Sequence, residues 1–307
     1  MLTSNNACWN FAKLGDCIIF DIEGKKMSTL LILSVLSAAF LHAFWNFQVK
    51  DTPNKAMGMA AVMFGHLPLA GIGLLYSGLP SLEAAPYLIA SAFLHLGYQV
   101  FLLNAYRFGS LTSIYPIARG MAPLLITLVS ILILNEMLEV SQILGIVIIS
   151  TAIICFGIKQ YRLANAELTG LLLACATGCF IAGYSVVDAI GTRISGSAIA
   201  FYGVSTFSSA VLFAIYLQIT NPSVLFSFHK KARNTLIYGG TASYLAYVIV
   251  LWACLHAPVA IISSLRETSL LFAIILGAIF LKEKITVFKI IMIVSILCGI
   301  LLLRLGW

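Results

Sequence analysis

The sequence predicts an all-helical integral membrane protein with about ten transmembrane helices, arranged as a 5+5 inverted repeat. Three observations predict this fold. The 307-residue chain is 61% apolar and only 9% charged, whereas soluble domains are roughly 45–50% apolar and about 25% charged. Charged and turn residues divide the chain into ten apolar runs. One half of the chain also repeats the other at a fixed offset.

Each apolar run is long enough for a membrane-spanning helix, which needs about 20 residues. The runs are rich in Leu, Ile, Val and Ala without strict polar–apolar alternation, which favours helices over a transmembrane barrel. In chain order the expected spans are roughly 28–49, 56–77, 86–106, 112–134, 141–158, 167–190, 198–220, 235–255, 259–281 and 287–305. Most connections are short, and residues 221–234 form the longest expected loop.

Residues 1–27 precede the first span and are expected to be a short N-terminal extension. They lack an apolar stretch leading to a small-residue cleavage site, so they do not resemble a signal peptide. Met27, which follows two lysines, is a candidate alternative start.

The internal repeat is clearest between the fourth and ninth spans. Setting "IARGMAPLLITLVSILILNEM" (117–137) over "SLRETSLLFAIILGAIFLKEK" (264–284) pairs Arg119 with Arg266 and Glu136 with Glu283, both at an offset of 147 residues. An odd number of helices in each half inverts the second half, which is the usual construction of alternating-access transporters. We therefore expect five-helix repeats over residues 28–158 and 167–305. The two glutamates, at symmetric helix ends, are expected to be solvated.

The basic residues are distributed unequally between the two sides of the membrane. The side of the termini carries five of them: Lys13, Lys25, Lys26, Arg193 and Arg304. The other side carries eleven: Lys50, Lys55, Arg107, Lys159, Arg162, Lys230, Lys231, Arg233, Lys282, Lys284 and Lys289. The positive-inside rule then predicts that both termini face outside.

Three stretches resemble one known family. They are "LHAFWNFQVK" (41–50), "AYRFGSLTSIYPIARGMAPLL" (105–125) and "ISSLRETSLLFAIILGAIFLKEK" (262–284), each similar to the ten-helix EamA-like branch of the drug/metabolite transporter superfamily. The resemblance covers residues 28–305. It implies a carrier with a central cavity between two inverted halves, commonly an exporter of small metabolites or toxic compounds.

Two features of this family bear on the expectations. Some relatives are drawn with their termini in the cytoplasm, opposite to the charge count, so both orientations stay open. The four-helix multidrug members use a glutamate of their first helix for proton coupling, but span 28–49 contains no acidic residue. That mechanism cannot be transferred to this chain.

Arginines within the fourth and ninth spans are candidate binding residues. A charge at the centre of a membrane helix costs roughly 2.5–3.5 kcal/mol, so each is a functional hypothesis. Arg119 cannot lose its charge. Its partner must therefore come from another helix, from backbone carbonyls or from a ligand. Pro116 and Pro123 each remove a backbone donor and predict an interrupted helix around it. Arg266 occupies the matching position of the other half.

Glu267 and Asp188 are the candidate proton-coupling residues. Neighbours on a helix point about 100° apart, so Glu267 does not pair with Arg266 and is free to meet Arg119 or to titrate. Asp188 lies close to Arg193 in the sequence, and a structural ion pair between them near the membrane interface is expected.

Polar and aromatic stripes mark the faces expected to line the cavity. The first and third spans each carry a histidine, an aromatic residue and an amide at positions i, i+3 and i+4, on one face that lipid will not accept. The candidate substrate-binding residues are these stripes, the two arginines and three tyrosines: Arg119, Arg266, Tyr115, His42, Trp45, Asn46, His95, Tyr98, Gln99, Tyr184 and Tyr244. Ala273-x-x-x-Gly277 is expected to serve close helix packing.

Several classes of function are excluded. The net charge is +7, but the basic residues lie mostly between spans, so no nucleic-acid partner is expected. The histidines and seven cysteines lack metal-ligand spacing, and neither disulfides, a metal nor another cofactor is predicted. Direct ATP coupling would need a phosphate loop, which is absent. The deep polar residues also lack the spacing of an intramembrane enzyme.

The sequence thus predicts a secondary active transporter, exporting a small polar or anionic metabolite across the plasma membrane by alternating access. The two arginines would hold the anion, and a proton gradient is a candidate driving force. If Glu267 instead neutralises the arginines, the cavity is neutral and a multidrug exporter of apolar or cationic compounds fits. A membrane scaffold or receptor is the alternative from another class. Membrane lipid surrounds the chain, and both a monomer and a homodimer stay open.

Overall fold

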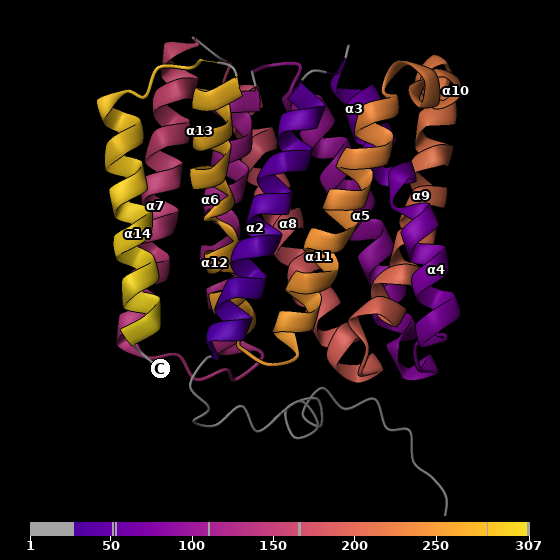
Figure 1. Cartoon of the computed structure of the whole chain (residues 1–307), viewed down its shortest axis with the longest axis horizontal. Helices are drawn as coiled ribbons and strands as arrows, with labels where there is room; N and C mark the ends of the chain where they lie inside the picture. The colour runs from indigo at the N-terminus through magenta and orange to yellow at the C-terminus, as the bar shows by residue number, and fades with distance from the viewer. Residues whose placement is uncertain are drawn as a thin grey trace, which may run out of the picture.

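The chain forms a slab of upright helices (Figure 1). The computed structural model describes residues 28–50, 52, 54–109, 111–164, 167–280 and 282–305, so the expected extension over 1–27 lies outside the described residues. In the described part, ten helical segments are long and apolar enough to cross a membrane. The predicted all-helical class and the ten spans are confirmed.

The spans follow the predicted order. Those of the first half are α2 (Thr29–Lys50), α3 with α4 (Lys55–Gly65 and Leu67–Ser77), η1 with α5 (Leu82–Ala84 and Ala85–Ala105), α6 (Leu111–Leu132) and α7 (Val140–Leu163). Those of the second half are α8 (Leu168–Ser195), α9 (Ala198–Thr220), η2 with α11 (Thr235–Gly239 and Gly240–Cys254), α12 with α13 (Val259–Arg266 and Ser269–Phe280) and α14 (Val287–Leu305).

The expected interruption around Arg119 is wrong, because α6 runs unbroken through Pro116 and Pro123. Helix α7 packs tightly against this stretch. A side chain on Gly157 would lie 3.3 Å from the Cβ of Pro116, and one on Gly120 would lie 3.1 Å from the backbone of α7. Close packing against a neighbouring helix therefore holds the backbone in place despite the two missing donors.

The interruptions fall instead in the second and ninth spans. Helix α3 ends at Gly65, and α4 begins at Leu67 with Pro68 in its first turn, where a missing N–H is tolerated. In the ninth span α12 ends at Arg266, and Glu267 lies in a tight turn before α13, its N–H donating to a carbonyl three residues back. Both interruptions lie near the middle of their spans.

The expected loop over 221–234 is also wrong, since most of it forms helix α10 (Pro222–Lys231). Val224 on one face is buried, whereas Phe226 is exposed and basic side chains fill the last turn. This is the pattern of a helix that lies along a membrane surface. It sits at the upper edge of the slab in Figure 1.

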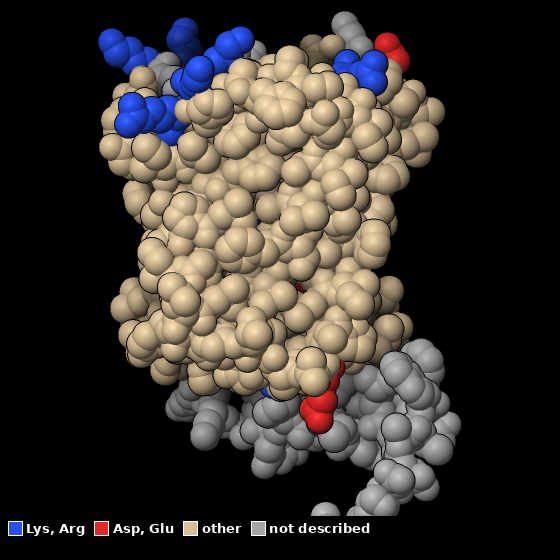
Figure 2. All heavy atoms as spheres, turned by 90° about the vertical axis from the view of Figure 1, so that its right-hand side faces the viewer, with Lys and Arg blue, Asp and Glu red and all other residues tan. Residues whose placement is uncertain are grey.

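Basic side chains gather at the end of the slab opposite the C terminus (Figure 2). We call this end, where Lys50, Lys230 and Lys284 are exposed, the basic end, and the opposite end the terminal end. Basic residues that the sequence assigned to one side thus lie together at one end of the fold. Which end faces the cytoplasm stays a prediction.

The two halves pack into each other. Helix α2 packs against α11 and α13, α14 packs against α7, and α6 packs against α8. Helix α6 and the α12–α13 span cross the slab in opposite directions (Figure 1), as an inverted repeat requires. The repeat itself stays a prediction, but each half completes the core of the other.

Two glycines permit a close crossing between α3 and α11. A Cβ added to Gly240 would lie 2.6 Å from the Cα of Gly65, which is closer than real side chains approach backbone. The crossing lies immediately beside the interruption at His66, and therefore fixes the position of that residue.

We expect Gly240→Ala to lower the free energy of unfolding by about 1–3 kcal/mol, because overpacking forces the two helices apart. The change is read as a lower melting temperature of the detergent-purified protein. Gly71→Ala is the matched control, since its added Cβ would meet only a Phe207 ring atom at 3.9 Å. Equal melting temperatures for the two variants would contradict the tight crossing.

Candidate functional site

A cavity of about 110 Å³ lies between helices of both halves. Its walls come from α2, α3, α5, α6, α8, α9, α11 and α12. All the expected substrate-binding residues line it except Tyr244. Val49 and Lys55 are also in the lining, so the cavity extends toward the basic end.

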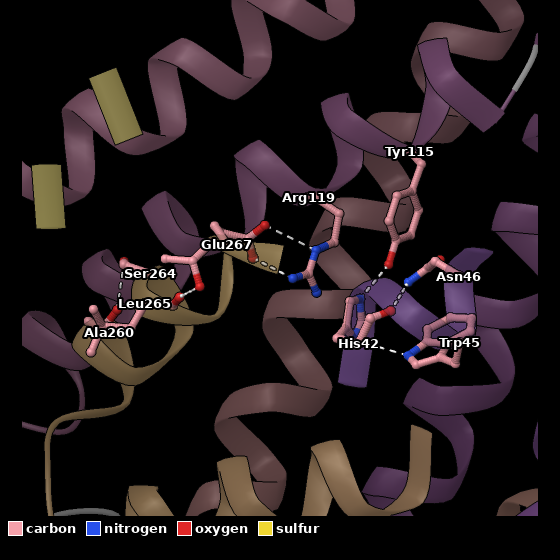
Figure 3. A network of polar contacts seen from close by, with 10 residues as sticks. His42, Trp45, Asn46, Tyr115, Arg119, Ala260, Ser264, Leu265 and Glu267 are labelled. Atoms are coloured by element: carbon pink, nitrogen blue, oxygen red, sulfur yellow. Dashed lines mark hydrogen bonds and ion pairs between the residues drawn. The ribbon is translucent and has the colours of Figure 1, made fainter. Parts of the chain in front are cut away.

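At the cavity wall Arg119 pairs with Glu267, which reaches it from the turn after α12 (Figure 3). The guanidinium and the carboxylate make two contacts: Arg119 Nη2 is 2.8 Å from Glu267 Oε1, and Arg119 Nε donates to Glu267 Oε2 at 3.1 Å. Their side chains are 2% and 1% exposed. Of the alternatives left open by the sequence, Arg119 therefore holds Glu267, and its charge is neutralised within the protein.

Arg266 has a different environment. It is 4% exposed and lines the cavity, with its guanidinium 5.8 Å from the centre of the Tyr247 ring. Among the described residues no carboxylate forms an ion pair with it, and its Nε has no hydrogen-bond partner. Arg266 is thus a buried cationic group of the cavity wall that has no carboxylate partner among the described residues.

Asp188 lies behind the cavity wall and is fully buried. Its Oδ2 accepts a hydrogen bond from the Tyr247 hydroxyl at 2.7 Å and lies 2.9 Å from His95 Nε2. Its Oδ1 has no partner. The expected pairing with Arg193 is wrong, because residues five apart on a helix point about 140° apart. His95 lines the cavity, so the His95 side chain lies between Asp188 and the cavity.

Arg193 instead closes the terminal end of the molecule. Its Nη2 lies 2.7 Å from Glu136 Oε1, and it donates to the carbonyls of Cys254 and Ala257. Glu136 also accepts from the backbone N–H of Val259 at 3.1 Å, at the start of α12. The Arg193 and Glu136 side chains are 4% and 6% exposed, so the expectation of a solvated Glu136 is wrong.

Glu283 at the basic end is about one-third exposed and lies between two lysines. Lys50 Nζ is 2.5 Å from its Oε1, and Lys289 Nζ is 3.1 Å from its Oε2. The hydrogen bond from Lys50, supported by that from Lys289, holds the pKa of Glu283 below its ordinary value. The acid–base contact at the basic end is therefore exposed, whereas that at the terminal end is buried.

A hydrogen-bonded group from α2 and α6 forms another part of the wall (Figure 3). Trp45 Nε1 donates to His42 Nδ1 at 3.2 Å, and His42 Nε2 lies 2.8 Å from the Tyr115 hydroxyl. Because Nδ1 accepts, a neutral His42 carries its proton on Nε2 and donates it to Tyr115. The Asn46 amide donates to the His42 carbonyl. The stripe predicted on the first span is thus fixed in orientation.

Sequence reasoning missed His66 and Tyr202, which also line the cavity. His66 occupies the interruption between α3 and α4, and its Nε2 has no partner. The signal was available, since a histidine followed by Leu-Pro within an apolar run indicates a broken helix. Tyr244, which was predicted to bind substrate, stacks behind Tyr202 with ring centres 5.3 Å apart and is absent from the lining.

The cavity lining combines aromatic, cationic and amide side chains. Within the residues that the structure describes, no group of three or more metal-ligating side chains is found. The cavity has aromatic walls and three cationic side chains in its lining, Lys55, Arg119 and Arg266, and the buried carboxylates of Glu267 and Asp188 contact lining residues. Such a chamber can select and hold a small polar molecule.

Comparison with known proteins agrees with this geometry. Residues 168–305, which hold the last five spans, match the EamA-like transporter family. A solved structure described only as "Crystal structure of protein" has a TM-score of 0.72 at 17% identity, covering 91% of this chain and 98% of that chain. At that identity the likeness shows the fold alone. No curated protein matches the sequence.

The fold covers both halves of the chain and the family match covers the second. The family consists of membrane transporters and not of enzymes. Residues 168–305 are therefore an EamA-like transporter region, and the chain is a multi-pass membrane transporter.

Proposed function

We propose that the protein is a secondary active transporter of small anionic metabolites and that Arg266 binds the anion. The observation that carries this proposal is the unequal pairing of the two buried arginines. Glu267 neutralises Arg119, whereas Arg266 lines the cavity without an ion pair among the described residues. A guanidinium donates two parallel hydrogen bonds to a carboxylate or phosphate, which favours such a group over a cation.

The charges near the cavity suggest how a proton is coupled to the anion. The Arg119–Glu267 pair contributes no net charge, and Lys55 lies near the basic end, where its Nζ donates to the carbonyls of Val49 and Lys50. Arg266 and Asp188 are then the remaining central charges. If His95 is neutral, these two cancel when Asp188 is ionised and leave one positive charge when it is protonated. The ionisable groups around Asp188 include His95, Tyr247, Tyr202, Tyr184 and Cys254. A proton on Asp188 would thus strengthen anion binding at Arg266, and each ligand would favour the other.

Alternating access supplies the proposed transport cycle. In the present conformation the buried Arg193–Glu136 pair closes the terminal end, and the cavity extends toward the basic end. The helix interruptions at His66 and Glu267 are places where the halves of a span can change their angle. The resemblance to exporters supports export, across the plasma membrane, as the direction.

A second candidate is an exporter of apolar or cationic compounds. The observation in its favour is the aromatic wall, in which Tyr184 stacks on His95 at 4.2 Å and meets Tyr98 edge-on at 5.6 Å. Aromatic faces attract organic cations. The charge of Arg266 disfavours a cation, so we rank this candidate second.

We expect Arg266→Gln to reduce anion counterflow in liposomes by roughly 10- to 100-fold at low substrate, since hydrogen bonds to charged groups contribute about 1.5–3 kcal/mol. A labelled panel of carboxylates, phosphorylated metabolites and one lipophilic cation identifies the substrate first. Arg266→Lys should retain part of the rate. Arg107→Gln, an exposed site at the basic end, is the control. Undiminished anion counterflow in Arg266→Gln, or counterflow of the cation alone, would refute the leading proposal.

We expect the Arg119–Glu267 pair to stabilise the folded protein. Arg119→Gln or Glu267→Gln alone should lower the free energy of unfolding by about 3–5 kcal/mol, because each leaves a buried charge without its partner. The double variant should recover most of that loss. Melting temperatures of the purified proteins measure it, and additive losses in the double variant would show that the two residues act independently.

We expect Asp188→Asn to abolish anion accumulation driven by a pH gradient while leaving exchange of labelled for unlabelled substrate measurable. The amide cannot carry the coupled proton but preserves the shape of the site. Glu83→Gln, at an exposed position, is the matched control. Gradient-driven accumulation that persists in Asp188→Asn would exclude this residue as the proton carrier and return attention to Glu267.

A further inference from the structure

A second cavity, of about 270 Å³, lies beside the first and is the larger of the two. It is enclosed by α2, α6, α7, α13 and α14. None of the central charged residues Arg119, Arg266, Glu267 and Asp188 lines it. The proposed transport mechanism therefore leaves this space without a role.

The two cavities share a wall. His42, Asn46 and Tyr115 line both of them. The hydrogen bond between His42 and the Tyr115 hydroxyl, 2.8 Å long, bridges α2 and α6 at this wall (Figure 3). The second cavity is thus a separate chamber in this conformation, and a ligand in it would contact the back of the first site.

Apolar side chains form the body of the second cavity. Phe47, Phe156, Leu270, Ile274 and Met292 line its sides, and small residues leave its space open. The predicted role of the Ala273-x-x-x-Gly277 spacing in helix packing is not what the structure shows. Both residues line this cavity, and a side chain on Gly277 would first meet the Glu283 carboxylate, at 3.2 Å.

Charged side chains gather where the cavity reaches the basic end. Lys50, Lys289 and Glu283 line it there, together with the amide residue Gln160. Two lysines and one glutamate leave a net charge of +1. Glu283 contacts both ammonium groups at once, so a carboxylate from the protein already occupies the position that an anionic group would take.

The volume sets the size of the occupant. An apolar cavity of roughly 150 Å³ takes up a benzene molecule. On the same scale, about 270 Å³ accommodates a chain or ring system of about ten carbon atoms.

We propose that this chamber is a second ligand site, for an amphipathic anion whose apolar body fills the cavity and whose carboxylate or phosphate group binds Lys50 and Lys289 in competition with Glu283. Such a molecule can come from the membrane, as an anionic lipid, or from the aqueous phase, as a free acid. The two sources share the same chemistry. This site does not depend on anion binding at Arg266.

The test uses radiolabelled decanoate as the probe and the full chain in nanodiscs of phosphatidylcholine. Saturable binding to the wild type is expected. Ala273→Phe fills the cavity and Lys289→Gln removes a head-group partner, and each should weaken binding by about tenfold or more, since an ionic hydrogen bond contributes about 1.5–3 kcal/mol. Glu283→Gln should strengthen binding, because the competing carboxylate is lost.

Two controls separate this site from the surface and from the central cavity. Ile279→Phe adds bulk on an exposed face of the same helix α13 and should leave binding unchanged. Arg266→Gln should also leave it unchanged, even if that variant loses transport. Decyltrimethylammonium, which has the same chain and the opposite charge, should not compete.

Undiminished decanoate binding in both Ala273→Phe and Lys289→Gln would overturn the proposal, as would equal competition by the ammonium compound. Lys289 is near the membrane surface, at the start of α14. The Lys289→Gln variant therefore still tests the proposal if Ala273→Phe does not fold. Loss of binding in Arg266→Gln would place the probe in the central cavity instead. Competition by lysophosphatidylglycerol would identify the membrane as the source, and its absence would identify the aqueous phase.

Discussion

The Arg119–Glu267 ion pair is the interaction on which the arrangement of the central site depends. An arginine inside an apolar slab cannot shed its charge, and a carboxylate that reaches it neutralises that charge. Glu267 does so from the turn between α12 and α13, and thereby ties the middle of α6 to the middle of the ninth span. Once Arg119 is satisfied in this way, Arg266 is the buried arginine of the cavity lining that has no carboxylate partner among the described residues.

The pairing also shows how two similar sequences acquire different roles. At the offset of 147 residues that matches Arg119 with Arg266, the position equivalent to Glu267 is Gly120. Gly120 has no carboxylate and lets α7 approach closely, so α6 stays continuous there. In the second half the same position carries the acid and lies in a break. Within the predicted repeat, one glycine and one glutamate at matched positions thus give the two halves different charges.

The sequence predicted what depends on local composition and helical periodicity. The ten spans follow from apolar length, and the His42 and His95 stripes were found because lipid excludes such faces. It failed where the outcome depends on which distant segments meet. Asp188 was assigned to Arg193 by proximity in sequence, but its partners come from α5 and α11. Periodicity predicts which face of a helix is buried, but it does not predict which helix packs against that face. The second cavity could therefore not be predicted from the sequence.

The two ends of the molecule differ in the energy needed to open them. At the terminal end the charges of Arg193 and Glu136 are almost fully buried and hydrogen-bonded to backbone, whereas Glu283 at the basic end is one-third exposed. The two glutamates are equivalent positions of the predicted repeat. Opening the terminal end would hydrate Arg193 and Glu136, while closing the basic end would dehydrate Lys50 and Glu283. Because one change offsets the other, the two conformations of the proposed transport cycle can differ little in free energy.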